Sequence, residues 1–345
     1  MGFIGVIIWL TFRLLFKGQE LGEILEDLGK ADLLWVTLAG IATFVFIAGE
    51  SCIIHYMLRV FGQKTNFLSC LKYSFIGFFF SYITPSSSGG QPAQMYYMKK
   101  DGVKIGLSTL IMLLITIAYK SVLVALGAVF LIFNFHTVAE YAGDLDWLLV
   151  LGFVLNIAFI SMLVAVFFKP NWARKAGIRI VNLLSGWKIV KGDNNEKLIT
   201  KITRICDNYT MGSTYIRENV VTVVKIFAIT LVQRMSLFSV TWLIYKAYGL
   251  SGVSFLDIIT MQIMIGIAVE MLPLPGAAGI TEVAFTTVFG RIFSSQLVKP
   301  AMLISRGLTF YCVLIVGGIV TLWAHIRVIR SDRTMEEKNK EGIKE

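Results

Sequence analysis

Long uninterrupted apolar runs are the feature that most constrains how this chain can fold. Clear runs occupy residues 33–57, 105–135, 147–168, 220–248 and 300–324. A helix of about 20 apolar residues crosses the ~30 Å hydrocarbon core of a bilayer, so each run is long enough for one span. None shows the two-residue alternation expected of a transmembrane barrel. The sequence therefore predicts an all-α polytopic membrane protein, and its 56% hydrophobic and 16% charged residues agree with that class.

A further apolar run at the N-terminus, residues 2–16, is shorter and contains Arg13. Because no small-residue cleavage site follows it, we interpret it as a retained first helix and not as a signal peptide. With this helix, the prediction is about six full spans.

Lys and Arg in the loops indicate which side of the membrane each loop faces, because short cytoplasmic loops are rich in these residues. The acidic segments 17–32 and 136–146 are expected outside. The basic loops near 59–64 and 99–104, the amphipathic connection 169–219 and the charged tail 331–345 are expected in the cytoplasm, together with both termini. The formal net charge of +10 fits this pattern, so no nucleic-acid binding is expected.

The segment TPSSSGGQPAQMYYM, which starts at Thr84, interrupts an apolar run with polar and flexible residues. The chain is predicted to be cytoplasmic both before and after it, with only about one spanning length between. We therefore expect a half-helix over 67–83, a turn, and a second half-helix that returns to the same side. Irregular backbone at membrane depth is tolerated only inside protein or beside water, which predicts a polar cavity here.

Individual residues of this break have expected roles. Pro85 has no amide hydrogen and disfavours helix at the residue before it. Gly89 and Gly90 permit backbone conformations that other residues avoid, and Ser87 or Ser88 can cap the second half-helix.

A second break, in FLDIITMQIMIGIAVEMLPLPGAAGITEVAF at 255–285, has the same layout. Pro85 and Gly89 correspond to Pro275 and Gly279 in the pattern P-x-x-x-G. The loop charges place its entry and exit outside, so the two halves, about 33–168 and 220–324, are expected to form an inverted repeat. Broken helices in inverted repeats are a transporter layout. One transmembrane domain over 1–330 is expected.

Charged residues inside the apolar runs are the next signal, because each costs roughly 2.5–3.5 kcal/mol at a helix centre. They are either ion pairs that lock helices together or parts of a pathway, and as a set beside two breaks they favour a pathway. The second half-helices begin near Ser88 and Thr281, and helix N-termini attract anions such as lipid phosphate. Glu282 is expected to hold Arg306 when no lipid is bound. The expected translocation residues are Pro85, Ser86, Ser87, Ser88, Gly89, Gly90, Gln91, Gln94, Lys120, Arg234, Glu270, Pro275, Gly276, Gly279, Thr281, Glu282 and Arg306; Glu50 is a further buried charge.

The motifs TPSSSGGQPAQ, PLPGAAGITEVAF and SRGLTFY together resemble the lysylphosphatidylglycerol synthase transmembrane family, the flippase-like membrane half of the multiple peptide resistance factor. The resemblance covers about residues 5 to 325. It implies a module that flips aminoacylated phosphatidylglycerol made by a separate soluble domain, and it matches Glu282 and Arg306 to the family's glutamate and arginine. We expect no synthase domain within these 345 residues, and hence no lysyltransferase activity.

The expected function is flippase-like or scramblase-like movement of a phospholipid, aminoacylated phosphatidylglycerol or similar, or of a polyprenyl-linked lipid, in a bacterial plasma membrane. The alternative is a non-transporting module that scaffolds or regulates a separate lipid synthase. An intramembrane enzyme lacks a recognisable nucleophile and base. The partners expected are anionic or aminoacylated membrane lipids, with a separate synthase and a homo-oligomer left open. No cofactor and no metal is expected, because the histidines and cysteines are scattered.

Overall fold

The computed structural model describes residues 26–141, 146–169 and 216–341, together with isolated positions between 171 and 214. The regular structure in these residues is helical throughout. Five helices are long and apolar enough to span a membrane: Leu33–Val60, Ile105–Phe133, Trp147–Phe168, Val220–Ala247 and Ser294–Arg330. They confirm the class of polytopic helical membrane protein. The predicted first helix over 2–16 lies outside the described residues, as does most of the connection 169–219.

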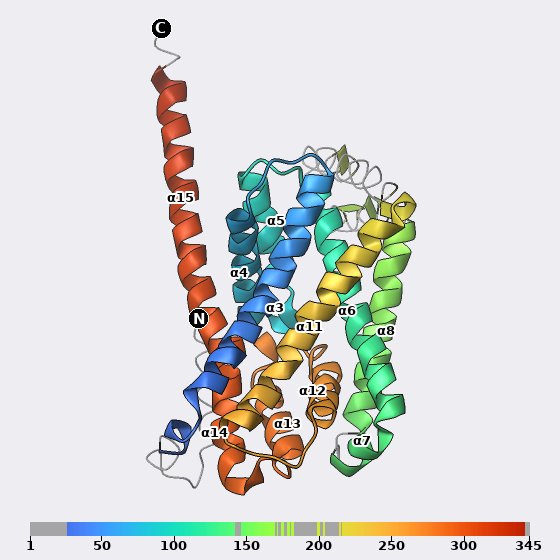
Figure 1. Cartoon of the computed structure of the whole chain (residues 1–345). Helices are drawn as coiled ribbons and strands as arrows, with labels where there is room; N and C mark the ends of the chain where they lie inside the picture. The colour runs from blue at the N-terminus through green and yellow to red at the C-terminus, as the bar shows by residue number, and fades with distance from the viewer. Residues whose placement is uncertain are drawn as a thin grey trace.

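Four long helices form the frame of the bundle (Figure 1): α3 (Leu33–Val60), α6 (Ile105–Phe133), α8 (Asp146–Phe168) and α11 (Val220–Ala247), with the short α7 (Phe135–Tyr141) between α6 and α8. The closest pair is α3 and α11, which pack along much of their length. Gly49 makes this approach possible, because a Cβ atom there would lie 2.9 Å from Cβ of Gln233. Small residues at a helix contact of this kind are typical of membrane bundles.

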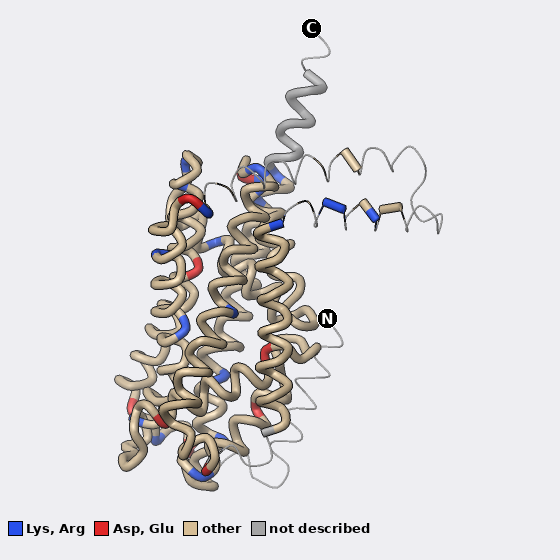
Figure 2. The backbone as a smooth tube through the Cα atoms, turned by 90° about the vertical axis from the view of Figure 1, so that its right-hand side faces the viewer, with Lys and Arg blue, Asp and Glu red and all other residues tan. Residues whose placement is uncertain are grey.

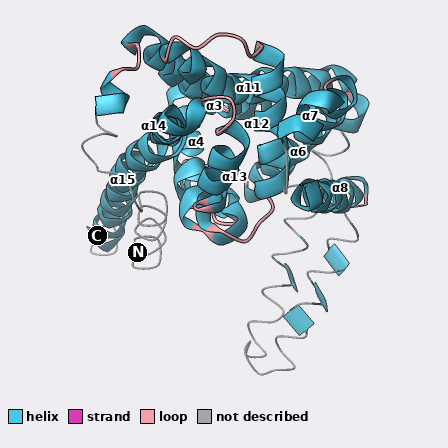
Figure 3. Ribbon diagram, turned by 90° about the horizontal axis from the view of Figure 1, so that it is seen from below, coloured by secondary structure: helices cyan, strands magenta, loops and turns pink. Residues whose placement is uncertain are grey.

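Four shorter helices form two hairpins inside this frame: α4 (Phe67–Ile83) with α5 (Gly90–Lys100), and α12 (Phe255–Val269) with α13 (Ile280–Phe289). The first hairpin occupies the upper half of the bundle and the second the lower half in Figure 1. Seen from below, α13 lies between α14 and α6 (Figure 3). The half-helix predicted over 67–83 coincides with α4.

The last span is longer than the predicted run 300–324. It comprises α14 (Ser294–Arg306), a π-helical segment (Gly307–Cys312) and α15 (Val313–Glu341), and it extends into the predicted tail. The π-segment is tied to the first hairpin, because the hydroxyl of Tyr82 donates to the carbonyl oxygen of Thr309 at 2.9 Å. Above it, a Cβ atom on Gly317 would lie 2.8 Å from the carbonyl oxygen of Phe75, so α15 packs tightly against α4.

Each hairpin has its own apolar core. Around α12 and α13 the core includes Ile265, Phe289 and Phe293, and around α4 and α5 it includes Ile76 and Met98. Charged residues are concentrated at the two ends of the bundle, and only a few lie between (Figure 2).

Candidate functional site at the two breaks

The two breaks share one turn conformation over Thr84–Ser87 and Leu274–Ala277, although 190 residues separate their prolines. Each is a 3-10 turn that begins on a proline, Pro85–Ser87 in the first and Pro275–Ala277 in the second. The residue before each proline is extended, and the residue after it has a positive φ, 50° at Ser86 and 54° at Gly276. The two turns lie against each other, with Cα atoms within 8 Å. The matching of Pro85 with Pro275 therefore corresponds to a real structural likeness. The two breaks diverge after the turn, because φ is −83° at Gly89 and 87° at Gly279, so these two glycines are not equivalent in the structure.

The predicted cap of the second half-helix in the first break is wrong. No side chain caps α5, whose N-cap is Gly89, and the side chains of Ser86–Ser88 are exposed. The hydroxyl oxygen of Thr84 instead accepts the Gly89 amide at 2.8 Å. Ser86 and Ser87 adopt positive φ values within the turn, and Ser88 precedes the Gly89 N-cap.

The predicted backbone role of Gly89 and Gly90 is also wrong. Gly89 has a φ of −83°, which any residue adopts, and Gly90 is the first residue of α5. These glycines matter for close approach: a Cβ atom on Gly90 would lie 2.1 Å from the Ser81 hydroxyl and 2.6 Å from the carbonyl oxygen of Gly77. Packing between α4 and α5, rather than torsional freedom, requires glycine here.

The second break holds the predicted pair of Glu282 and Arg306. Arg306 Nε donates to Glu282 Oε1 at 2.8 Å, and Glu282 Oε2 accepts the Gly279 amide at 2.7 Å. Arg306 Nη2 also reaches the carbonyl oxygen of Gly276 at 3.5 Å, and its guanidinium carbon lies 4.4 Å from the centre of the Phe310 ring. Glu282 thus satisfies the start of α13 and orients Arg306 beside the break.

Two other residues of this break have local roles. Gly279 has a φ of 87°, which favours glycine. The Thr281 hydroxyl donates to the carbonyl oxygen of Ala277 at 2.8 Å, so it stabilises the turn.

Three of the predicted residues converge at the end of α12, where two cations share one carboxylate. Arg234 of α11 donates through Nη1 and Nη2 to the two oxygens of Glu270, at 2.6 and 3.0 Å. Lys120 of α6 donates to Glu270 Oε2 at 2.9 Å. Arg234 has no solvent exposure, and its guanidinium carbon lies 3.4 Å from the centre of the Tyr119 ring. The Nε of Arg234 is buried and has no partner.

A second polar group joins α3, α4 and α5. The side-chain amide of Gln94 donates to Glu50, which also bonds to the hydroxyl of Ser74. The hydroxyl of Ser51 in turn donates to that of Ser74 at 2.9 Å. Gly77 leaves the space that the Gln94 side chain fills, since a Cβ atom there would overlap with it. Glu50 and Gln94, predicted separately, therefore form one site.

Gln91 faces a different neighbour. Its amide nitrogen donates to the hydroxyl of Thr116 and reaches the carbonyl oxygen of Met112 at 3.5 Å, both on α6.

Two tyrosines that the sequence did not single out connect these groups. Tyr119 in α6 lies under the guanidinium of Arg234 at 3.4 Å, and Tyr82 at the end of α4 has its ring centre 4.8 Å from that of Phe310, the ring that Arg306 also contacts. Only their positions in the sequence could have pointed to a role at the site. Tyr82 comes shortly before the first break, and Tyr119 is next to the lysine inside an apolar run. We call the six ionised or ionisable side chains around them the central charges: Glu50, Lys120, Arg234, Glu270, Glu282 and Arg306.

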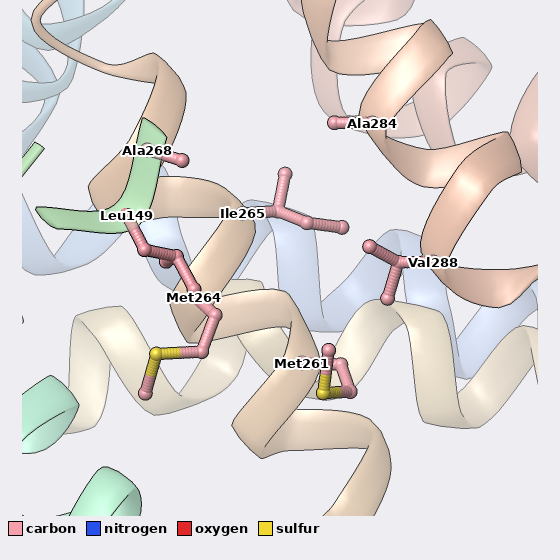
Figure 4. Close-up of a pocket in the computed structure, with 7 residues that line it drawn as sticks. All are labelled: Leu149, Met261, Met264, Ile265, Ala268, Ala284 and Val288. Carbon is pink, nitrogen blue, oxygen red and sulfur yellow. The ribbon is translucent and has the colours of Figure 1, made fainter. Parts of the chain in front are cut away.

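The small hollow in Figure 4 lies between α8, α12 and α13, and none of the central charges lines it. Its volume of about 10 Å³ is about the space of one water molecule. It is lined only by apolar side chains, namely Leu149, Met261, Met264, Ile265, Ala268, Ala284 and Val288. It cannot hold a lipid headgroup, and the polar cavity expected at the first break stays a prediction. Within the described residues, no group of three or more His, Cys, Asp or Glu side chains could hold a metal ion.

Apolar spans, two broken hairpins that meet at their turns and charges gathered at that junction define a multi-pass integral membrane protein. The chain belongs to the family described as the lysylphosphatidylglycerol synthase TM region, whose pattern matches residues 2–317. It is also similar to a UPF0104 membrane protein of Archaeoglobus fulgidus, with 22% identity over 268 residues that cover 77% of this chain and 79% of that relative. The resemblance inferred from the three motifs is thereby confirmed, and the family relates the chain to membrane lipids.

Proposed function

We propose that this protein moves a phosphate-bearing lipid headgroup between the leaflets of the membrane. The observation that carries the proposal is the meeting of two broken hairpins beside three cations, Lys120, Arg234 and Arg306. The side chains of Lys120 and Arg306 are each 12% exposed and that of Glu270 is 23% exposed, although all three belong to an apolar bundle. Charges that keep some exposure at this depth are typical of a substrate path.

The two half-helix N-termini are not equivalent as anion sites. The first turn of α13 contains Glu282, which already accepts the Gly279 amide. The first turn of α5 contains no acidic residue, so its positive end has no carboxylate of its own. We therefore expect a phosphate to meet the start of α5 first, with Arg306 reaching it from the adjoining second break.

Arg306 would act by exchanging partners. A guanidinium binds a carboxylate or a phosphate with similar planar geometry, so it can leave Glu282 for a headgroup without losing its charge partner. The lipid tails would stay in the bilayer while the headgroup crosses the short polar junction. In this mechanism the chain carries out no covalent chemistry and needs no cofactor.

The test follows a fluorescent phosphatidylglycerol in phosphatidylcholine vesicles that contain the purified protein. A membrane-impermeant reductant quenches only the outer leaflet, so the rate at which protected lipid becomes accessible reports movement. Charge-assisted contacts contribute about 1.5–3 kcal/mol, so we expect Arg306→Gln to slow movement at least about tenfold. Arg291→Gln is the matched control, because Arg291 is exposed and donates to the backbone oxygen of Glu140 at the end of the bundle.

The rival interpretation is that the chain scaffolds a separate lipid synthase and that Arg306 only locks helices; the family description, which names a synthase, favours it. It predicts that Arg306→Gln unfolds the protein and that the double variant with Glu282→Gln restores both stability and normal behaviour. Our proposal expects the double variant to be folded and still slow. If vesicles with the wild-type protein move lipid no faster than protein-free vesicles, lipid movement is not its function.

A further inference from the structure

Glu50 differs from the other central charges because its partners are neutral. Gln94 and Ser74 are hydrogen-bonded to it, and none of the ion pairs among the described residues includes it. We propose that Glu50 binds a proton together with an anionic lipid headgroup, so that the two ligands enter the site as a pair. This inference rests on the proposed function and specifies how pH would regulate it.

The surroundings of Glu50 form a wall of hydrogen-bonding groups on one side. Gln94 is 3% exposed, and Ser74 and Ser51 are fully buried, whereas Glu50 itself is only partly buried. A carboxyl group in this position keeps its hydrogen bonds whether or not it is ionised, since hydroxyl and amide groups can serve either form. Its partial exposure leaves the carboxyl group open to protonation.

The charges that face Glu50 determine what its protonation does. Tyr82 of α4 and Tyr119 of α6 are two titratable groups that interact electrostatically with Glu50. The neighbouring helix α11 contributes Arg234 beneath Tyr119, and α14 contributes Arg306 near Tyr82. From α5 the neutral Gln94 donates to Glu50.

Without Glu50, the central charges comprise three cations and two carboxylates. Ionised Glu50 brings them to neutrality, and protonated Glu50 leaves one positive charge without compensation. Such a surplus is costly at membrane depth, and a singly charged phosphate diester would remove it. Proton and anion therefore favour each other's binding, and this coupling must act equally in both directions.

The first experiment measures proton uptake by the wild-type protein. Short-chain phosphatidylglycerol is added to the detergent-solubilised protein in a weakly buffered solution with a pH indicator, and zwitterionic short-chain phosphatidylcholine serves as the comparison lipid. We expect uptake of up to one proton for each phosphatidylglycerol bound, and none with phosphatidylcholine. Affinity for phosphatidylglycerol should fall about tenfold per pH unit once Glu50 ionises.

Glu50→Gln is the matching variant, because its amide resembles the protonated carboxyl group in shape and charge. We expect it to bind phosphatidylglycerol with an affinity that does not change with pH and without proton uptake. The control is Glu140→Gln, since Glu140 is exposed at the end of the bundle, and it should behave like the wild type. The infrared carbonyl band of a protonated carboxylic acid, present in the wild type at low pH and missing in Glu50→Gln, gives a readout that needs no lipid.

Three outcomes separate this inference from the proposed function. Phosphatidylglycerol binding without proton uptake in the wild type overturns the inference and leaves lipid movement standing. Uptake that persists unchanged in folded Glu50→Gln overturns it as well, because another group then carries the proton. If phosphatidylglycerol does not bind at any pH, both proposals fail together.

Discussion

At the scale of single residues, Glu270 joins two of the central cations. It is the shared partner of Arg234 and Lys120, which come from α11 and α6. Arg234 is fully buried, so removing its partner would leave a charge in an apolar interior. Breaking a buried ion pair in this way costs more free energy than the intact pair contributes to stability. The reason is that the remaining ion is neither solvated nor paired.

We therefore expect Glu270→Gln to be strongly destabilising, by about 3 kcal/mol. Lys120→Met should cost much less, about 1 kcal/mol or below, because Glu270 keeps its two bonds to Arg234 and Lys120 is the more exposed partner. Thermal unfolding of the two variants in the same detergent compares them directly. Equal melting temperatures for Glu270→Gln and the wild type would show that water already solvates Arg234.

At the scale of secondary-structure elements, the close packing of α4 against α5 sets the geometry of the first hairpin. The prolines predicted both breaks, because a residue without an amide hydrogen interrupts a helix wherever it falls. The left-handed residues Ser86, Ser87 and Ala277 were not predictable, since serine and alanine carry no preference for positive φ. The π-segment at Gly307–Cys312 was also missed, because it lies within an apolar run that was predicted as one continuous span.

Gly90→Ala should push α5 away from α4 and destabilise the protein by about 1–3 kcal/mol. The added methyl group would overlap with the Ser81 hydroxyl, which can rotate, and with the backbone oxygen of Gly77, which cannot. Gly40→Ala is the control in α3, because the nearest atom to its added Cβ lies 3.9 Å away and alanine favours helix. Melting temperatures should fall for the first variant and hold or rise for the second; the reverse order would contradict the packing described at the hairpin.

At the scale of the whole molecule, the two hairpins lie in opposite halves of one bundle and meet at their turns (Figure 1). Span lengths and loop charges predicted this arrangement because bilayer thickness and the enrichment of Lys and Arg on one side act on the chain regardless of its tertiary contacts. The partners of the central charges could not be predicted in the same way. Lys120 and Glu270 are 150 residues apart, and only the packing of α6 against α12 brings them together.

The predicted entry of the two hairpins from opposite sides of the membrane leads to a labelling test. In a background without the four native cysteines, single cysteines replace four exposed loop or helix-end residues: Lys64 and Lys99 around the first hairpin, and Ser251 and Ser295 around the second. A full span between the members of either pair would put them on opposite sides. We expect both members of each pair to behave alike, because the chain enters and leaves on the same side. A membrane-impermeant maleimide applied to intact cells should label Ser251→Cys and Ser295→Cys, whereas Lys64→Cys and Lys99→Cys should react only after the membrane is permeabilised. Labelling of one member of a pair without the other would show that the hairpin crosses the membrane, and the inverted repeat would then be wrong.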